Sequence, residues 1–144
     1  MLNGPNLNLL GTREPHIYGL TTLAEIEAMC RDRAAALGLA LTFRQSNDEG
    51  ALVNWIQAAR EEADALIINP AVYSFRSVAL IDAMKAFPGP IIELHVSNIH
   101  SRDAWHLHSI TSTAATAVIC GLGALGYVVA LEAAARLLAQ ENGR

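Results

Sequence analysis

The chain has 144 residues, of which 52% are hydrophobic and 17% charged, with a formal net charge of −4. A chain of this length buries roughly 68–70% of its unfolded surface, so it needs no metal or disulfide to stay folded. The sequence pI of ≈ 5.7 and the lack of any Lys/Arg cluster argue against a nucleic-acid-binding protein. We expect a single domain over residues 1–144, with a sheet covered on both faces or with subunits packed together.

The cysteines and apolar segments indicate the compartment. Cys30 and Cys120 are far apart in the sequence, and we expect buried, reduced thiols rather than a disulfide or a metal site. No basic region followed by a long apolar run begins the chain, so no signal peptide is predicted. Residues 114–135 come closest to a membrane span, but glycines and Glu132 interrupt them. We predict a cytoplasmic protein with no membrane partner.

Residues 3–19, NGPNLNLLGTREPHIYG, form a long polar segment near the start of the chain. The asparagines offer amide groups, the glycines allow unusual backbone conformations, and the two prolines add stiffness. Connections between elements usually run about 4–6 residues, and a much longer one in a compact domain is commonly functional. We therefore predict that this segment carries half of an active site.

Apolar periodicity and turn residues predict alternating strands and helices along the rest of the chain. The strands are predicted at residues 1–2, 39–45, 65–68, 90–96 and 115–120. The helices are predicted at residues 22–37, 50–63, 77–86 and from 122 or 123 to 140. Thr22 and Glu25 form a capping box for the first helix. Residues 1–2 are expected to be the stub of a strand whose earlier residues are missing, and the strand at 39–45 is expected near a sheet edge.

This alternation predicts an α/β domain with one parallel five-stranded sheet and helices on both faces. Ligands bind such sheets beyond the carboxyl ends of the strands. The polar residues predicted at these ends are Asn3, Asn6, Asn69, Glu93, His95 and Ser97. Segments distant in the sequence are therefore expected to converge on one rim of the sheet.

Tyr18 and Arg13 are candidates for a base and its activator. Ionising a free tyrosine at pH 7 costs roughly 4 kcal/mol. A fixed cation nearby lowers that cost, and a guanidinium does not itself give up a proton. The alternative is that Arg13 is solvated and Tyr18 packs under the loop.

His95 lies two residues after Glu93 on a predicted strand, so the two side chains point to the same side. A carboxylate beside an imidazole fixes its tautomer and favours its protonated form, which suits a general acid. The alternative is a core histidine satisfied by a buried glutamate, but both residues lie at the carboxyl end of the strand.

Two other patterns are expected to carry no function. The spacing of His95, His100, His106 and His108 matches no recognised metal-ligand motif, so no metal site is predicted. Residues 121–126, GLGALG, match the dinucleotide fingerprint GxGxxG, but they follow the last strand instead of the first. We expect these glycines to serve the close packing of helix on strand.

Four segments together resemble a known family, the type II 3-dehydroquinate dehydratases. They are residues 3–19, RQSNDEG at 44–50, ELHVSNIH at 93–100 and VICGLGALGY at 118–127. The resemblance covers nearly the whole chain. It implies a flavodoxin-like three-layer sandwich, no cofactor, a small carboxylate substrate and a homododecamer built as a tetramer of trimers.

The resemblance also implies a trans elimination of water from a cyclic β-hydroxy ketone, 3-dehydroquinate, through an enolate. Tyr18 corresponds to the base that takes the proton next to the ketone, and Arg13 to the arginine that keeps it ionised. Asn6 corresponds to the residue that holds a water against the enolate oxygen. His95 corresponds to the acid that protonates the departing hydroxyl.

Further positions correspond to residues that bind the substrate in the family. Asn69 matches a residue that orients the departing hydroxyl and the carboxylate, and the amides of Val96 and Ser97 match the carboxylate-binding turn. Glu93 is a supporting residue. Asp82 corresponds to an acid that reaches a neighbouring subunit's site.

The chain departs from the family at three positions. Phe75 replaces the family's histidine, Ala71 replaces its glycine, and His106 replaces its arginine. In the family that histidine and arginine bind ring hydroxyls remote from the elimination, so their loss predicts weaker diol recognition. Arg76 and Arg102 are candidates to compensate.

These departures leave three hypotheses open. The first is a 3-dehydroquinate dehydratase with altered hydroxyl binding. The second is a paralogue that uses the same base and acid on a less hydroxylated ring in another pathway. The third is a catalytically silent oligomer that binds a ligand, and the retention of Tyr18 and His95 argues against it.

Overall fold

The structure is a computed structural model, and it describes residues 1–106 and 108–143. Five parallel strands form one sheet in the order β2-β1-β3-β4-β5. They are β1 (Leu2–Asn3), β2 (Arg44–Gln45), β3 (Leu66–Asn69), β4 (Ile91–His95) and β5 (Ala117–Cys120). This is the flavodoxin-like strand order, so the predicted fold class is confirmed.

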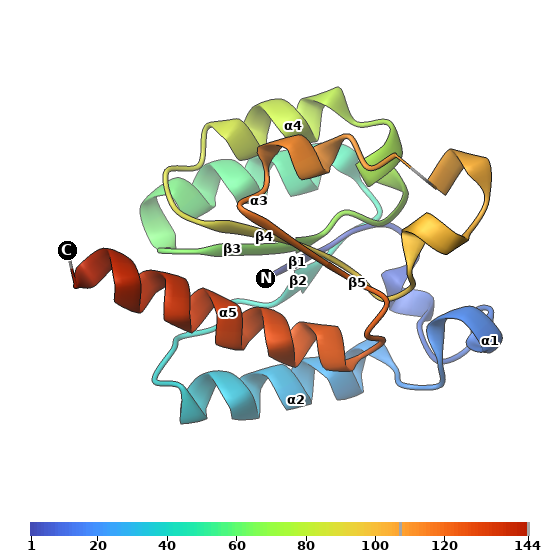
Figure 1. Cartoon of the computed structure of the whole chain (residues 1–144), viewed down its shortest axis with the longest axis horizontal. Helices are drawn as coiled ribbons and strands as arrows, with labels where there is room; N and C mark the ends of the chain where they lie inside the picture. Colours follow the sequence, from blue (N-terminus) through green and yellow to red (C-terminus); the bar gives the residue numbers. More distant parts are fainter. Residues whose placement is uncertain (107, 144) are drawn as a thin grey trace.

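Helices cover both faces of the sheet, which gives three layers (Figure 1). Helices α2 (Leu23–Ala36) and α5 (Leu125–Asn142) lie side by side on one face, and α3 (Glu49–Glu62) and α4 (Val78–Lys85) lie on the other. Each face has its own buried apolar cluster. The short helix α1 (Pro15–Tyr18) lies beyond the carboxyl end of the sheet, within the long polar segment.

The capping box predicted for the first helix is present. The Thr22 hydroxyl accepts from the Glu25 backbone N–H at 3.2 Å, and the Glu25 carboxylate accepts from the Thr22 N–H at 2.8 Å. This pair of hydrogen bonds fixes where α2 begins, and therefore where the polar segment ends.

The length predicted for the strand at residues 39–45 is wrong. Only Arg44 and Gln45 form β2, because β1 offers only Leu2 and Asn3 as partners. The edge position expected for this strand is confirmed, since β2 is first in the strand order. The predicted long helix starts later than expected: its first residue is Leu125, because the residues before it form a glycine turn.

The glycines of the GLGALG motif have structural roles. A Cβ on Gly126 would lie 2.9 Å from Leu94 Cδ1, so this glycine permits the close approach of α5 to β4, as expected. The backbone N–H of Gly123, which has a left-handed φ of 59°, donates to the Val96 carbonyl at 3.0 Å. The turn between β5 and α5 therefore holds the residue that follows β4.

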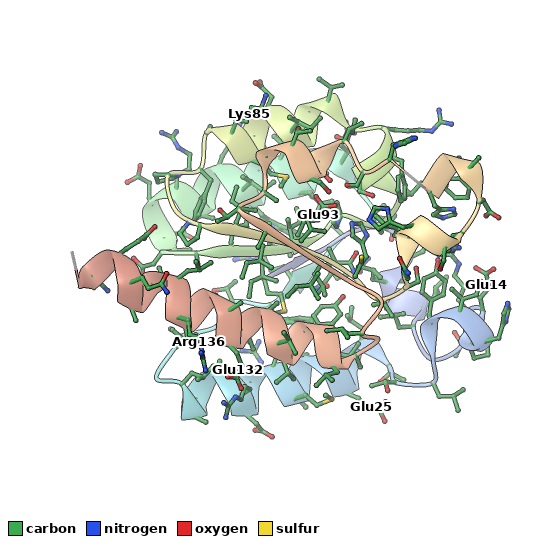
Figure 2. The ribbon with its side chains drawn as sticks, in the orientation of Figure 1. Glu14, Glu25, Lys85, Glu93, Glu132 and Arg136 are labelled. Atoms are coloured by element: carbon green, nitrogen blue, oxygen red, sulfur yellow. The ribbon has the colours of Figure 1, made fainter. Side chains whose placement is uncertain are left out.

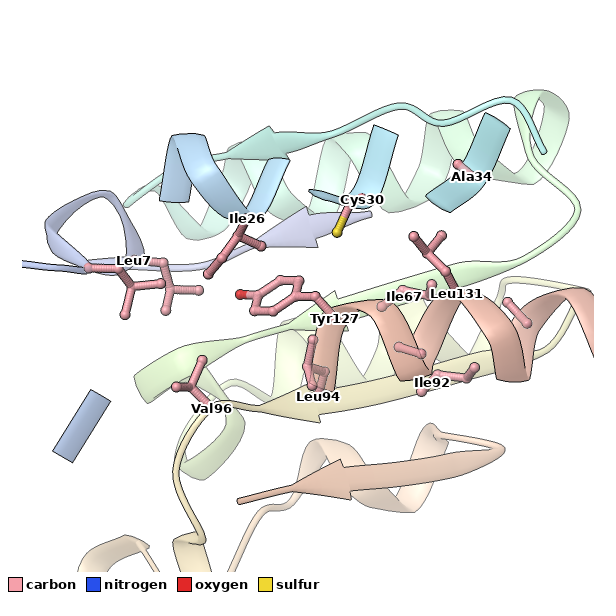
Figure 3. Packing of buried hydrophobic residues seen from close by; sticks show 13 residues of the cluster. Leu7, Ile26, Cys30, Ala34, Ile67, Ile92, Leu94, Val96, Tyr127 and Leu131 are labelled. Atoms are coloured by element: carbon pink, nitrogen blue, oxygen red, sulfur yellow. The ribbon is translucent and has the colours of Figure 1, made fainter. Parts of the chain in front are cut away.

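Tyr127 ties three elements together beneath the carboxyl ends of the strands (Figure 3). Its side chain is fully buried on α5, and its hydroxyl donates to Asn3 Oδ1 at 2.8 Å. The same hydroxyl accepts from Asn69 Nδ2 at 3.0 Å. Both asparagines are buried strand residues, so this network fixes the floor on which the polar rim is built.

Within residues 1–106 and 108–143, no helix is both long enough and apolar enough to cross a membrane.

Candidate active site

Polar side chains from the carboxyl ends of several strands line one cavity beside α1. The predicted site residues in its wall are Asn6, Arg13, Tyr18, Asn69, Phe75, His95, Val96, Ser97 and His106. Two predicted residues lie outside the wall: Glu93 is behind His95, and Asp82 is exposed on α4. The structure thus brings the distant segments together on one rim, as the strand pattern predicted.

His95 and Glu93 form a buried pair on β4. His95 Nε2 lies 2.6 Å from Glu93 Oε1, and the two residues are 4% and 0% exposed. The prediction that both side chains share one face of the strand is confirmed. Because Glu93 engages Nε2, Nδ1 is the imidazole nitrogen available to the cavity, where it can deliver a proton.

Hydrogen bonds keep the Glu93 carboxyl ionised despite its burial. Burial alone raises the pKa of this carboxyl, but hydrogen bonds from His95, Ser109 and Thr111 outweigh burial and lower the pKa below its usual value. The imidazole of His95 therefore faces a carboxylate.

Tyr18, at the end of α1, lies beside two guanidinium groups. Arg102 Nη1 donates to the Tyr18 hydroxyl at 2.8 Å, and its guanidinium carbon is 5.3 Å from the Tyr18 ring centroid. The Arg13 guanidinium carbon is 5.6 Å from the same centroid. A cation that touches a tyrosine hydroxyl stabilises the phenolate, so this arrangement suits a base.

Sequence reasoning missed Arg102 as the partner of the Tyr18 hydroxyl. Arg13 lies beside the ring, as expected, but its closest ionic partner is Glu14, with Nε 3.5 Å from Oε2. From the sequence, Arg102 is a candidate only to compensate for the lost hydroxyl-binding residues. The available signal was its place in the polar segment after β4, the strand that carries His95.

The asparagine at the end of β3 is held in one orientation. Asn69 Oδ1 accepts from the Ala71 backbone N–H at 3.2 Å, and Asn69 Nδ2 donates to Tyr127. Ala71 has a φ of 52°, and Asn6, which also lines the cavity, has a φ of 65°. Left-handed backbone is strained at an alanine, and such strain concentrates at functional sites.

Comparisons with known proteins decide the family. Residues 1–135 match the family model described as dehydroquinase class II. The chain belongs to this family. It is 54% identical over 138 residues to a 3-dehydroquinate dehydratase of Caulobacter sp. (strain K31), which covers 96% of this chain and 94% of that protein. It is 56% identical over 132 residues to a catabolic 3-dehydroquinase of Aspergillus oryzae, which covers 92% of this chain and 86% of that protein.

A solved structure agrees with this family assignment. The crystal structure of the type II dehydroquinase from Propionibacterium acnes is similar with a TM-score of 0.91 and 41% identity. The match covers 94% of this chain and 93% of that chain.

One part of the cavity wall of this class II dehydroquinase is aromatic. The ring centroid of Phe75 lies 5.1 Å from that of His106 and 6.0 Å from that of Trp105, both in edge-on geometry. Phe75 also lies 6.3 Å from the His95 ring. We call Phe75, Trp105 and His106 the aromatic wall. Arg76, the other candidate to compensate for lost hydroxyl binding, does not line the cavity.

His106 lies in this wall as a buried, neutral side chain. Burial and the charge of Arg102 lower its pKa, and the opposing effects of Asp103 and Glu14 do not cancel this shift. His106 Nδ1 is 3.4 Å from Asp103 Oδ2, but it makes no hydrogen bond among the described residues. His106 stands where the resemblance to the family implies an arginine that binds ring hydroxyls. This position therefore carries an uncharged imidazole ring.

The described residues contain no group of three or more His, Cys, Asp and Glu side chains placed to hold a metal ion. Cys30 is buried and Cys120 half-buried, and both are free thiols.

Proposed function

We propose that this chain is a type II 3-dehydroquinate dehydratase, a hydro-lyase that converts 3-dehydroquinate to 3-dehydroshikimate. One observation carries the proposal: the Arg102-bound hydroxyl of Tyr18 and the Glu93-bound imidazole of His95 line the same cavity. A base and an acid in one cavity are what a β-elimination of water needs. The names of the relatives support the substrate.

In the first step the Tyr18 phenolate removes the proton next to the ketone. The electron pair of that C–H bond moves to the carbonyl oxygen and forms an enolate. Arg102 stabilises the phenolate before the transfer, and Asn6 holds a water against the enolate oxygen.

In the second step the enolate collapses and the β C–O bond breaks. The imidazolium of His95 gives its proton to the departing hydroxyl, so that water leaves and a conjugated enone remains. Glu93 stabilises the imidazolium before the transfer. Tyr18 then holds the proton taken from carbon and His95 lacks one, so proton exchange with solvent resets both groups, and no cofactor is required.

Asn69 and the backbone amides of Val96 and Ser97 bind the substrate carboxylate and orient the departing hydroxyl. These residues follow β3 and β4, which are neighbours in the sheet. A rigid anchor of this kind holds the reacting carbon near both the base and the acid.

We also propose the homododecamer, a tetramer of trimers. The exposed position of Asp82 on α4, outside its own cavity, suits a side chain that reaches a neighbouring subunit's site. The single sheet supports one domain, and the cytoplasmic location expected from the sequence stays a prediction.

An assay with 3-dehydroquinate tests the activity. We expect the assembled protein to produce an absorbing conjugated enone, followed by its ultraviolet absorbance. A folded and assembled protein without turnover would contradict the proposal.

A second candidate is elimination from a less hydroxylated ring, and the aromatic wall favours it. Phe75 offers no hydrogen bond, and a polar substrate group left unpaired there costs about 1–3 kcal/mol. Competition between 3-dehydroquinate and an analogue without the remote ring hydroxyls discriminates the two. Higher kcat/KM for the analogue supports the second candidate, and higher kcat/KM for 3-dehydroquinate rules it out.

A further inference from the structure

The carboxylate of Glu93 is surrounded by more donors than its partnership with His95 requires. Figure 2 shows Glu93 near the centre of the molecule, between the sheet and the 3₁₀ turn at Thr111–Ala114. Ser112 Oγ donates to Glu93 Oε1 at 3.0 Å, and Thr111 Oγ1 donates to Oε2 at 2.8 Å. Ser109 Oγ also donates to Oε1, at 2.5 Å. We call Ser109, Thr111 and Ser112 the hydroxyl cradle.

The hydroxyl cradle stabilises the Glu93 carboxylate in place of a Lys or Arg side chain. The elements nearest to Glu93, namely β3, β5 and the 111–114 turn, carry no charged side chain. On the helices packed around them, Asp82 and Lys85 of α4 are exposed and Glu132 of α5 pairs with Arg33. The titratable groups that remain beside Glu93 are His95 itself and Cys120. Cys120 lies on β5, opposite His95 in the β4–β5 register.

This arrangement decides where the proton of the pair lies. An imidazolium beside a buried carboxylate can pass its proton to that carboxylate, which leaves two neutral groups and no acid facing the cavity. Hydroxyl donors stabilise the carboxylate but not the protonated carboxyl, so they oppose this transfer. Thr111 binds Oε2 and so does not compete with His95 for Oε1, and its side chain is fully buried.

We propose that Ser109, Thr111 and Ser112 are positioning residues that keep Glu93 ionised, so that the proton shared with His95 stays on the imidazole. This inference rests on the proposed role of His95 as the acid. The hydroxyl cradle is held beside β4, because the 111–114 turn leads directly into β5, the neighbour of β4 in the sheet.

Three substitutions test the proposal by kinetics. Thr111→Val keeps the side-chain shape but removes the hydroxyl, and Thr111→Ser keeps the hydroxyl. Thr113→Val removes an exposed hydroxyl that bonds the Ile110 carbonyl. A hydrogen bond to a charged group corresponds to about a 10- to 100-fold change in the proton distribution. We expect Thr111→Val to lower kcat about tenfold with little change in KM, and Thr111→Ser and Thr113→Val to stay near the wild type.

The pH profile distinguishes this role from a purely structural one. Without the Thr111 hydroxyl the pair binds its proton more tightly, because the carboxylate is the form that loses a donor. The alkaline limb of kcat therefore moves to higher pH in Thr111→Val, whereas a loss of folded protein lowers kcat without moving the limb. A folded Thr111→Val protein with the wild-type kcat and limb overturns the proposal, as does a defect that Thr111→Ser shares.

Infrared spectroscopy tests the proton position without any turnover. We expect the Thr111→Val/Ser112→Ala protein to show a carboxylic-acid band at neutral pH that is absent from the wild type. The band should disappear on adding Glu93→Gln, which assigns it. If the protein fails to convert 3-dehydroquinate but the band appears, the proposed function fails and the cradle stands; a folded double variant without the band overturns the cradle.

Discussion

The two sides of the cavity are built in different ways. The side that carries Tyr18 and His95 is polar, and each of these residues is fixed by a charged partner, Arg102 and Glu93. The aromatic wall is uncharged, and its members meet through ring contacts, edge-on at Phe75 and tilted between Trp105 and His106. The polar side contains the parts that a proton-transfer reaction requires, whereas the aromatic wall contains parts that select the shape and polarity of the ring.

The supporting elements explain this difference. His95 belongs to a central strand, and its partner Glu93 is fully buried. The aromatic wall comes from 3₁₀ turns at Ala71–Phe75 and Ala104–His106. Irregular segments at the rim accept substitutions that a central strand does not, so specificity can change while the chemistry is kept.

The largest expected effect is the loss of the base. We predict that Tyr18→Phe lowers kcat about 10²- to 10⁴-fold, the usual contribution of a general base. Tyr73→Phe is the matched control, because its hydroxyl bonds the Asn47 carbonyl and lies outside the cavity wall. Enone formation from 3-dehydroquinate measures both, and near-normal turnover by Tyr18→Phe would refute the role of this residue.

The next effect separates the two arginines beside the base. Arg102 reaches the Tyr18 hydroxyl, whereas Arg13 lies against the ring. We predict that Arg102→Ala lowers kcat/KM by about 10²-fold, in line with the loss of a hydrogen bond to a charged group, and that Arg13→Ala lowers it less. Equal losses, or a larger loss for Arg13→Ala, would return the activating role to Arg13.

On the polar side of the cavity, the sequence predicted the reacting residues Tyr18 and His95 better than the contact between Tyr18 and Arg102. Strand periodicity placed Glu93 and His95 on one face, and the family motif marked Tyr18, because both signals are local. Arg102 is 84 residues from Tyr18, and no local pattern records that their side chains meet. The length of β2 was wrong for a similar reason, since a strand extends only where a neighbouring strand offers backbone partners.

The aromatic wall is where polarity can be restored. We predict that Phe75→His with His106→Arg raises kcat/KM for 3-dehydroquinate about tenfold, which corresponds to about one recovered hydrogen bond. The expected gain depends on the remote ring hydroxyls, so an analogue without them should gain nothing from the double substitution. No gain with 3-dehydroquinate would count against a wall adapted to a less polar ring.

The neutral histidine of the wall predicts a pH dependence of stability. Burial and Arg102 lower the pKa of His106 in the folded state, so the unfolded chain takes up its proton at higher pH. The contribution of His106 to the free energy of unfolding is therefore complete above the unfolded pKa of about 6.5 and is lost as the pH falls through the folded value. His106→Gln should lose less stability than the wild type between about pH 7 and 5 in urea titrations. Parallel pH curves for the two proteins would show that His106 is not held neutral.

The smallest expected effect lies at Ala71, which lines the cavity. Its φ of 52° is left-handed, which costs an alanine about 1–2 kcal/mol, whereas glycine pays about 0.4–1 kcal/mol through its freer unfolded state. Ala71→Gly should therefore raise stability by about 0.5 kcal/mol. Ala79→Gly, on the exposed face of α4, should lower it by about 1 kcal/mol. Opposite signs in thermal unfolding would establish strain at Ala71. Because the Ala71 N–H holds Asn69, unchanged kcat/KM in Ala71→Gly would show that this strain is not needed to orient the carboxylate anchor.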